Sequence, residues 1–207
     1  LILGLEIQQD SVDSYPEDIM FGKHQSSNFA GFAQDRITVS DKLAIIPGAR
    51  YDHRFLENDK SEGQVSPKVG LSYQINDDTA LRFSMGQAFR SPSLGEIYLK
   101  QEAHSGIKFR YNPDLKSEKL RLYAEVGLKR NVFGFLKTDI SAFIYDYSEL
   151  ILWESLSEDE FQVTNLNRAV MTGLETGTSL SWHNLSATAN YTFLNAKDKT
   201  NDRDNDT

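Results

Sequence analysis

Cysteine is absent from the 207-residue chain. Its absence excludes disulfide frameworks, thiol catalysis and cysteine-ligated zinc or iron–sulfur sites. Long apolar runs are missing too, because none approaches the roughly 18 residues that a membrane-spanning helix requires. Basic residues are outnumbered, with 22 Lys and Arg against 30 Asp and Glu, and they are scattered along the chain. The sequence therefore gives no support to a nucleic-acid-binding role.

Signatures of common enzymes are missing as well. Gly-x-Ser-x-Gly, a Walker loop and His-Glu-x-x-His do not occur. An enzyme embedded in a barrel wall would need a base near its outer rim, and only His24 and His104 occupy suitable positions. We identify no catalytic nucleophile for either histidine. We therefore expect a protein that is not an enzyme and that carries no resident cofactor.

Alternation of apolar and polar residues with a period of two is the dominant pattern. In residues 81–90, Leu, Phe, Met, Gln and Phe alternate with Arg, Ser, Gly, Ala and Arg. Strands of this kind present one face to an apolar medium and the other to a polar one. The same alternation recurs in residues 43–55, 65–75, 120–129 and 185–193. Residues 28–40 and 135–148 break the phase, which a β-bulge or an interfacial position would explain.

The connections between these strands fall into two classes. Short turns are expected at residues 40–42, 76–78, 131–134 and 183–184. Longer polar loops are expected at residues 10–27, 56–64, 91–116 and 149–160. Long strands with short turns at one rim and long loops at the other are typical of an outer-membrane barrel. The fold predicted is all-β: an antiparallel transmembrane β-barrel with short periplasmic turns and long extracellular loops. A soluble β-sandwich is the alternative.

About nine strands are expected, which is fewer than a wide barrel needs. An open sheet in lipid would leave the polar groups of its edge strands unsatisfied, at a cost of several kcal/mol each. The amino-terminal residues 1–9 have no signal-peptide pattern and are expected to form a strand. We therefore expect residues 1–207 to be a fragment of a larger barrel, whose remaining strands lie outside this sequence.

Two motifs resemble those of TonB-dependent outer-membrane receptors. The stretch Ser84-Met-Gly-Gln-Ala-Phe-Arg-Ser-Pro-Ser-Leu-Gly-Glu-Ile-Tyr-Leu99 is similar to the family's Phe-Arg-Ala-Pro-Ser-Leu-x-Glu-Leu-Tyr signature. Asn112-Pro-Asp-Leu-Lys-Ser-Glu118 follows at a loop's distance and resembles Asn-Pro-Asn/Asp-Leu-Lys-Pro-Glu. Residues 31–35, 47–52 and 165–175 are similar to barrel strands of the same family. Ser91 and Ser117 replace the family's usual Ala and Pro.

The resemblance implies active import across the bacterial outer membrane. The expected substrate is a scarce metal chelate, with a ferric siderophore as the default and haem or cobalamin as alternatives. The expected partners are outer-membrane lipid and the TonB complex, which would contact a plug region absent from this sequence. A passive porin-like channel or an adhesin barrel without energy coupling is the competing interpretation.

The two motifs supply the first set of candidate site residues. Pro92 ends a strand because it has no N–H to donate, and Asn112–Pro113 starts a turn. Both motifs could serve only to shape one loop, without contacting a ligand. The candidates in these motifs are Phe89, Arg90, Pro92, Asn112 and Pro113.

A second set of candidates occupies the alternate strand positions that carry polar residues, and these positions share one face of each strand. Their mixed charges could pair with one another, hold a plug domain or line the substrate path. The candidates expected to face the lumen are Arg50, Asp52, Arg82, Glu125 and Glu175.

Two further features allow metal chemistry. His104 lies between the two motifs, and in the haem-transporting branch of the family a histidine of this loop ligates haem iron. Residues Asp198 to Asp206 form an acidic segment whose alternating aspartates could bind Ca²⁺. The glycine and the distal glutamate of a calcium loop are missing there, which favours a solvated loop.

Overall fold

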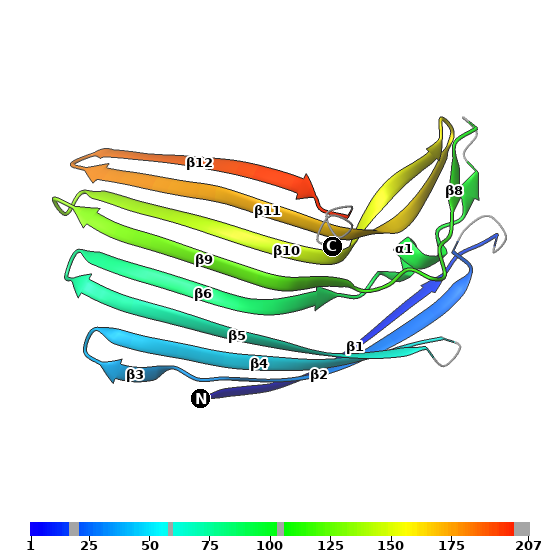
Figure 1. Ribbon diagram of the computed structural model, residues 1–207, viewed down its shortest axis with the longest axis horizontal. Coiled ribbons are helices and arrows are strands. Elements are labelled where there is room, and N and C mark those ends of the chain that lie inside the picture. The colour runs from blue at the N-terminus through cyan, green and yellow to red at the C-terminus, as the bar shows by residue number, and fades with distance from the viewer. Residues whose placement is uncertain (17–20, 58–59, 103–105, 201–207) are drawn as a thin grey trace, which may run out of the picture.

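The computed structural model describes residues 1–16, 21–57, 60–102 and 106–200. These residues form one sheet of twelve strands and a single short helix (Figure 1). No helix among them is long and apolar enough to cross a membrane. The elements are β1 (Ile2–Asp13), β2 (Lys23–Gln34), β3 (Ile37–Ser40), β4 (Leu43–Leu56), β5 (Ser61–Asn76), β6 (Thr79–Arg90), α1 (Leu94–Tyr98), β7 (Gln101–Glu102), β8 (Lys108–Arg110), β9 (Glu118–Val132), β10 (Leu136–Ser157), β11 (Glu160–Trp182) and β12 (Leu185–Asp198).

Long antiparallel strands make up the wall. Within the described residues, nine strands have at least 12 residues each, in agreement with the expected number. They pair in the order β1-β2-β4-β5-β6-β9-β10-β11, and β12 pairs with β11. The short β7 and β8 belong to the long connection between β6 and β9, and β8 runs parallel to β11.

The phase break in residues 28–40 is an interruption of the ladder between β2 and β3. Gln34 pairs with Gly48 and Ile37 pairs with Ile45, so no extra residue is inserted. Asp35 N–H still donates to the Pro47 carbonyl at 3.0 Å. Pro47 has no N–H that could donate back to Asp35, so the backbone hydrogen-bond ladder is interrupted at this pair. No bulge is therefore present at Asp35, but the register does shift further along the segment, between Thr38 and Ser40.

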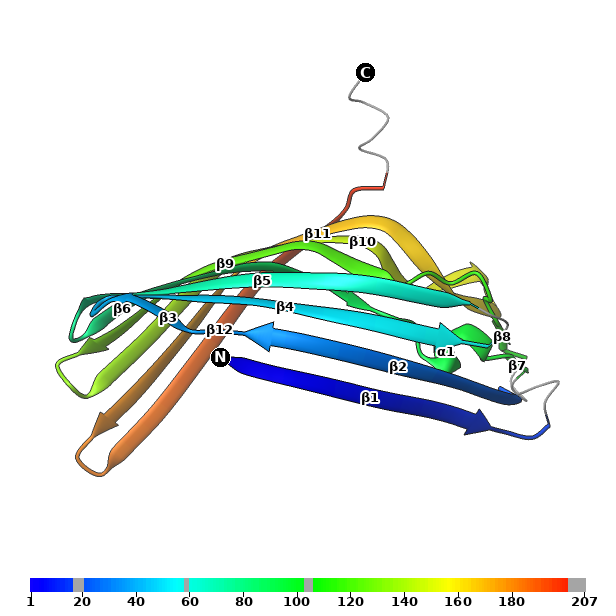
Figure 2. The same cartoon turned by 90° about the horizontal axis from the view of Figure 1, so that it is seen from below.

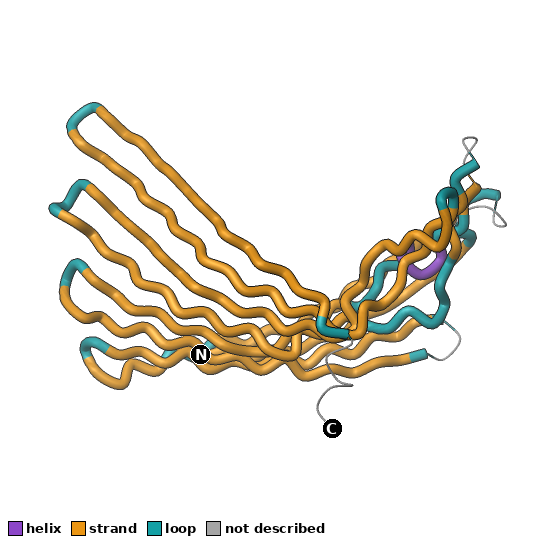
Figure 3. The backbone as a smooth tube through the Cα atoms, turned by 45° about the horizontal axis from the view of Figure 1, so that its top comes forward, coloured by secondary structure: helices purple, strands orange, loops and turns teal. Residues whose placement is uncertain are grey.

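The short turns lie together at one end of the sheet and the longer connections at the other (Figure 3). Three longer connections occupy residues 14–22, 57–60 and 91–117. The loop expected at residues 149–160 is wrong, because β10 and β11 stay paired as far as Ser157 and Glu160. Residues 161–164 alternate like the strands of the wall, residues 150–153 are all apolar, and Ile151 and Val163 are buried. The hairpin therefore continues past the wall instead of ending in a loop.

The two faces of the wall differ in polarity, as the alternation predicts. Side chains directly opposite each other in an antiparallel pair lie on the same face. One row of paired residues on the apolar face is Tyr73, Leu81, Leu128 and Ile140, each of them 39–43 % exposed. The neighbouring row on the polar face is Arg82, Gly127, Ser141 and Glu175. A sheet that is apolar on one face and polar on the other is suited to a wall between lipid and an aqueous lumen.

The sheet is strongly curved and open (Figure 2). Among the described residues, β1 and β12 each have a strand neighbour on one side only. Hollows on the sheet are lined by polar-face residues such as Glu6, Arg50 and Asp52 in one place and Arg82 and Glu175 in another. The polar face is therefore the inside of the curve, and we call it the lumenal face.

Large buried apolar side chains are concentrated beyond the wall, at the end with the long connections. Leu94 and Ile97 of α1 are 7 % and 2 % exposed, and Ile151 and Val163 of the extended hairpin are 9 % and 2 % exposed. The wall itself is one layer thick and has no comparable core. The long-connection end is consequently a packed layer of its own, which we call the outer layer.

Candidate functional site

The first lumenal cluster surrounds Arg50 on β4. Its guanidinium donates to both carboxylate oxygens of Asp52 at 2.8 Å and to Glu6 on β1 at 3.0 Å. Asn28 on β2 donates to the same Asp52 carboxylate at 3.2 Å. Asp52 is 5 % exposed, so its charge is buried but matched. The predicted lumenal residues Arg50 and Asp52 are thus brought together and cross-link three strands.

The second lumenal cluster surrounds Arg82 on β6. Its two terminal nitrogens donate to the Asp139 carboxylate on β10 at 2.9 and 2.7 Å, and one of them lies 3.9 Å from Glu125 on β9. This side chain crosses β9 above Gly127, where a Cβ would lie 2.9 Å from Arg82 Nη2. Glu175 lines the same hollow and makes no direct ion pair with any described residue.

The aromatic residues that broke the phase in β10 face the lumen. Phe143 pairs with Glu125, and its ring lies over Gly173 of β11. Tyr145 stacks on Phe143 with ring centroids 4.9 Å apart. The irregularity lies in β9, which has an extra residue at Arg121–Leu122 relative to both neighbouring strands. The bulge considered for this region exists, but in the neighbouring strand.

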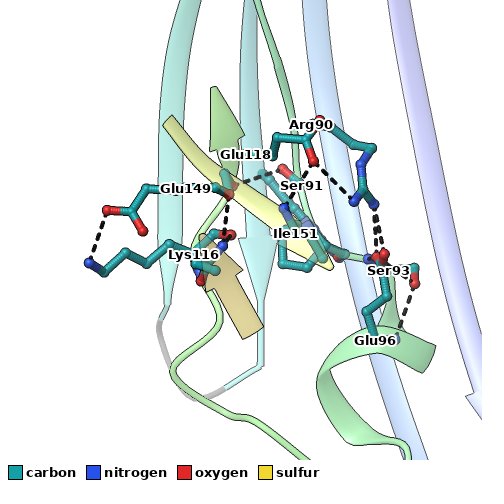
Figure 4. Close-up of polar contacts among 12 residues, drawn as sticks. Arg90, Ser91, Ser93, Glu96, Lys116, Glu118, Glu149 and Ile151 are labelled. Atoms are coloured by element: carbon teal, nitrogen blue, oxygen red, sulfur yellow. Dashed lines mark hydrogen bonds and ion pairs between the residues drawn. The ribbon is translucent and has the colours of Figure 1, made fainter. Parts of the chain in front are cut away.

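The first family-like motif forms a braced corner at the outer rim (Figure 4). Arg90 at the end of β6 donates to both oxygens of Glu96 at 2.9 Å and lies 3.4 Å from Glu118 of β9. Ser93 and Glu96 form a reciprocal capping box at the start of α1. Glu118 also accepts the Ile151 N–H at 3.1 Å, which ties this corner to the β10–β11 hairpin.

Glu96 has a pKa below its ordinary value. Burial alone would raise that pKa, but the hydrogen bonds from Ser93 and Arg90 and the positive charge of Arg90 outweigh it. The carboxylate is therefore held in its charged form by the same contacts that position the corner.

The second motif closes the long connection onto β11. Asn112 donates from its side chain to the Val163 carbonyl at 2.9 Å, and its own N–H donates to the Ile97 carbonyl at 3.0 Å. Asn165 of β11 accepts the Lys116 N–H at 2.9 Å and donates back to the Lys116 carbonyl at 3.0 Å. The connection is consequently fixed to the hairpin by backbone-directed bonds.

Both motifs meet at a cavity of about 660 Å³, which we call the outer cavity. Pro92 comes from the first motif and Pro113 from the second, and further lining residues come from α1, β4, β5, β9 and β10 and from the connection at Lys60. The Pro113 carbonyl accepts from Lys60 at 2.9 Å, and the Pro92 carbonyl accepts from Arg54. Phe89 lies in a separate hollow of about 460 Å³, the inner cavity, together with Arg50 and Asp52. The structure thus brings Pro92 and Pro113 to one cavity and Phe89 to the other. Ligand contact by the motif residues remains a prediction.

Most of the candidates for metal chemistry lie outside the described residues, namely His104 and residues 201–207 of the acidic segment. Asp198 accepts the Thr200 N–H at 2.8 Å. His24 is hydrogen-bonded to Glu57 at 2.9 Å and stacks on Tyr98 at 3.5 Å. No group of three or more potential metal ligands occurs within the described part of the chain.

Several residues of these clusters were not predicted as site residues. Asp139 shares the parity of Ser141 on β10, so the alternation could have indicated its lumenal position. Arg54 has the same parity as Arg50 and Asp52 on β4. Glu96 and Glu118 lie inside the quoted motifs, but nothing in their spacing indicated that both would reach Arg90.

A family model described as TonB dependent receptor-like, beta-barrel matches residues 6–207. The chain belongs to this family. Proteins of this family are transport receptors of the outer membrane of Gram-negative bacteria. The membership confirms the antiparallel barrel fold and the outer-membrane location that the alternation and the motifs predict.

The similar curated proteins and solved structures include receptors for siderophores and for a hemophore. The ferrienterobactin receptor of Escherichia coli (strain K12) is 27 % identical over 164 residues, which are 71 % of this chain and 21 % of that protein. The siderophore receptor PirA from Pseudomonas aeruginosa superposes with a TM-score of 0.79 at 20 % identity, covering 95 % of this chain and 39 % of that one. The Serratia marcescens hemophore receptor HasR, solved with its hemophore HasA and heme, gives 0.80 at 18 % identity, covering 93 % and 38 %. The chain spans about a fifth of the curated relative.

Proposed function

We propose that the chain forms part of the wall and outer rim of a TonB-dependent importer of a ferric siderophore. The observation that carries this proposal is the outer cavity, which both family motifs line above a lumenal face of fixed charge pairs. A wall that only separates lipid from water needs alternation alone. An ordered cavity at the extracellular rim is suited to holding a solute before it enters the lumen.

The wall would act with parts that belong to the whole protein. A plug region would close the lumen and contact the TonB complex, and its energised movement would open the path. Arg50, Arg82 and Glu175 would then face the plug or the passing substrate. The described residues would bind and guide the substrate without breaking a bond in it, so the protein would not be an enzyme.

Haem import is the second candidate. HasR, whose fold this chain shares, was solved with heme, and imidazole is a common axial ligand of haem iron. His104 is the residue that would ligate the haem iron. Cobalamin import and a passive porin-like or adhesin role lack a comparable observation.

Uptake by the full-length receptor tests the proposal. The receptor is expressed in a bacterial strain that lacks its own siderophore, haem and cobalamin receptors, and cells are supplied with each iron-loaded or cobalt-containing probe. We expect growth on a ferric siderophore that disappears when the TonB gene is deleted. Uptake that persists without TonB would indicate a passive channel. Haem uptake that His104→Ala abolishes would favour the second candidate.

A further inference from the structure

Arg54 on β4 differs from Arg50, Arg82 and Arg90, the arginines of the lumenal face and rim described above. Arg50, Arg82 and Arg90 each donate directly to a carboxylate at 3.0 Å or less. Arg54 is half-buried, yet its partners within the described residues are neutral: the Pro92 carbonyl and the Ser26 hydroxyl, the latter at 3.3 Å. Its positive charge is therefore not matched by a direct ion pair.

The contact between Arg54 and Pro92 separates the two cavities. These two residues alone line both the outer cavity and the inner cavity among the described residues. Because a guanidinium has more N–H donors than these two acceptors use, donors remain for a further acceptor in either cavity. A solute that passes from the rim into the lumen along this wall would meet Arg54 at the boundary.

The outer cavity is locally basic on a chain of net charge −8. Its lining includes four basic residues against three acidic ones. Lys116 and Lys119 each have a carboxylate partner, at 3.3 and 3.8 Å. Lys60 is exposed and donates to the neutral Pro113 carbonyl at 2.9 Å. Among the described residues of this cavity, Arg54 is thus the more buried of the two cations that have no direct ion pair. A half-buried cation of this kind attracts an anion more strongly than an exposed one, because less water screens it.

We propose that Arg54 binds anionic oxygen atoms of the substrate at the boundary between the two cavities. The inference rests on the proposed import function and narrows its substrate class to an anionic chelate, with the guanidinium donating charge-assisted hydrogen bonds to catecholate or carboxylate oxygens. Pro92 and Ser26 hold the guanidinium in place before the substrate arrives, so little side-chain freedom is lost on binding.

The test compares dissociation constants of the full-length receptor for anionic and uncharged probes. The anionic probes are a ferric tricatecholate, ferric citrate and haem, and the uncharged probes are a ferric trihydroxamate and cyanocobalamin. Binding is measured for the wild type, Arg54→Gln, Arg54→Lys and the matched control Arg121→Gln. Arg121 is an exposed arginine of β9 that lines neither cavity. Heat-stable migration of the barrel on a denaturing gel verifies the fold of each variant.

We expect the wild type to bind an anionic probe most tightly. Arg54→Gln should weaken that binding by about 10- to 100-fold, as loss of a hydrogen bond to a charged group implies. The loss should shrink at high salt, Arg54→Lys should recover part of it, and Arg121→Gln should bind like the wild type. Preference for an uncharged probe, or a folded Arg54→Gln receptor that binds as the wild type does, would overturn the assignment and leave import standing. Absence of binding to every probe would overturn the proposed function as well.

Discussion

Arg82 shows how one absent side chain permits a lumenal ion pair. Its guanidinium reaches Asp139 two strands away by crossing β9 above Gly127. A Cβ at Gly127 would lie 2.9 Å from Arg82 Nη2 and 3.2 Å from Nε. Any larger residue at this position would displace the guanidinium from Asp139.

We predict that Gly127→Ala destabilises the barrel. The expected cost is about 1–3 kcal/mol, because the added methyl group overpacks the contact and weakens a charge-assisted bond. Urea unfolding of the full-length receptor in detergent micelles measures it. The control is Gly70→Ala on the same face of β5, where the nearest atom would be Ile46 Cβ at 3.6 Å. Equal stabilities of the two variants would contradict the role given to Gly127.

The alternation of polar and apolar residues along the strands predicts which residues share a face, but it does not predict which of them form ion pairs. Arg50, Asp52, Arg82 and Glu125 lie on one face of the sheet, because alternation fixes the face of every residue in a regular strand. That this face meets the lumen remains a prediction. Asp139 was not assigned as a partner because it is 57 residues from Arg82, and pairing across β9 depends on strand register. The register between strands depends on the tertiary structure, so a single sequence predicts it only weakly.

At the scale of elements, the long connection between β6 and β9 is a folded layer. α1 begins at a capping box, β8 joins the edge of β11 in parallel, and Asn112 ties the connection to Val163. A five-residue helix and two short strands have too few residues to produce a periodic signal. The sequence therefore predicted a loop here, and the motifs alone indicated that it had a defined shape.

The hairpin at residues 149–160 was mistaken for a loop for a different reason. Glu149, Glu154, Glu158 and Asp159 give this segment the polarity of a loop. Its strands lie beyond the wall, where one side meets water and the other packs on the outer layer through Ile151 and Val163. Charged residues are compatible with such a strand, because no lipid contacts it.

We predict that the outer layer loosens in acid through Glu96. Because its pKa is lowered in the folded layer, its stabilising contribution is complete above the ordinary value of 4.5 and is lost as the pH falls through the lower folded value. Hydrogen exchange of residues 93–99, corrected for intrinsic rates, should therefore be faster at about pH 3 than at about pH 7.

The variant Glu96→Gln removes the titrating charge. Its exchange in residues 93–99 should already be fast at neutral pH and should change little on acidification. Glu154→Gln, at an exposed position of β10, is the matched control and should behave like the wild type. If Glu96→Gln retained the wild-type protection at neutral pH, the charge of Glu96 would not stabilise this layer.

At the scale of the whole molecule, a curved sheet one layer thick relies on its surroundings. Its apolar face leaves large side chains such as Val126, Leu128 and Ile140 39–46 % exposed, which water would penalise and lipid would not. Its lumenal face carries the ion pairs and leads to the outer cavity. The import proposal and the Arg54 proposal both require this assignment of the two faces.

Single-cysteine labelling along β9 tests that assignment most directly. The chain has no cysteine of its own, so each introduced thiol is the only one that it contributes. A nitroxide is attached in turn at positions 123 to 128 of the full-length receptor in lipid bilayers, and collision with oxygen and with a water-soluble nickel chelate is measured. We expect labels at Ala124, Val126 and Leu128 to favour oxygen, and labels at Tyr123, Glu125 and Gly127 to favour the nickel chelate. The reverse pattern, or uniform accessibility along the strand, would contradict the account.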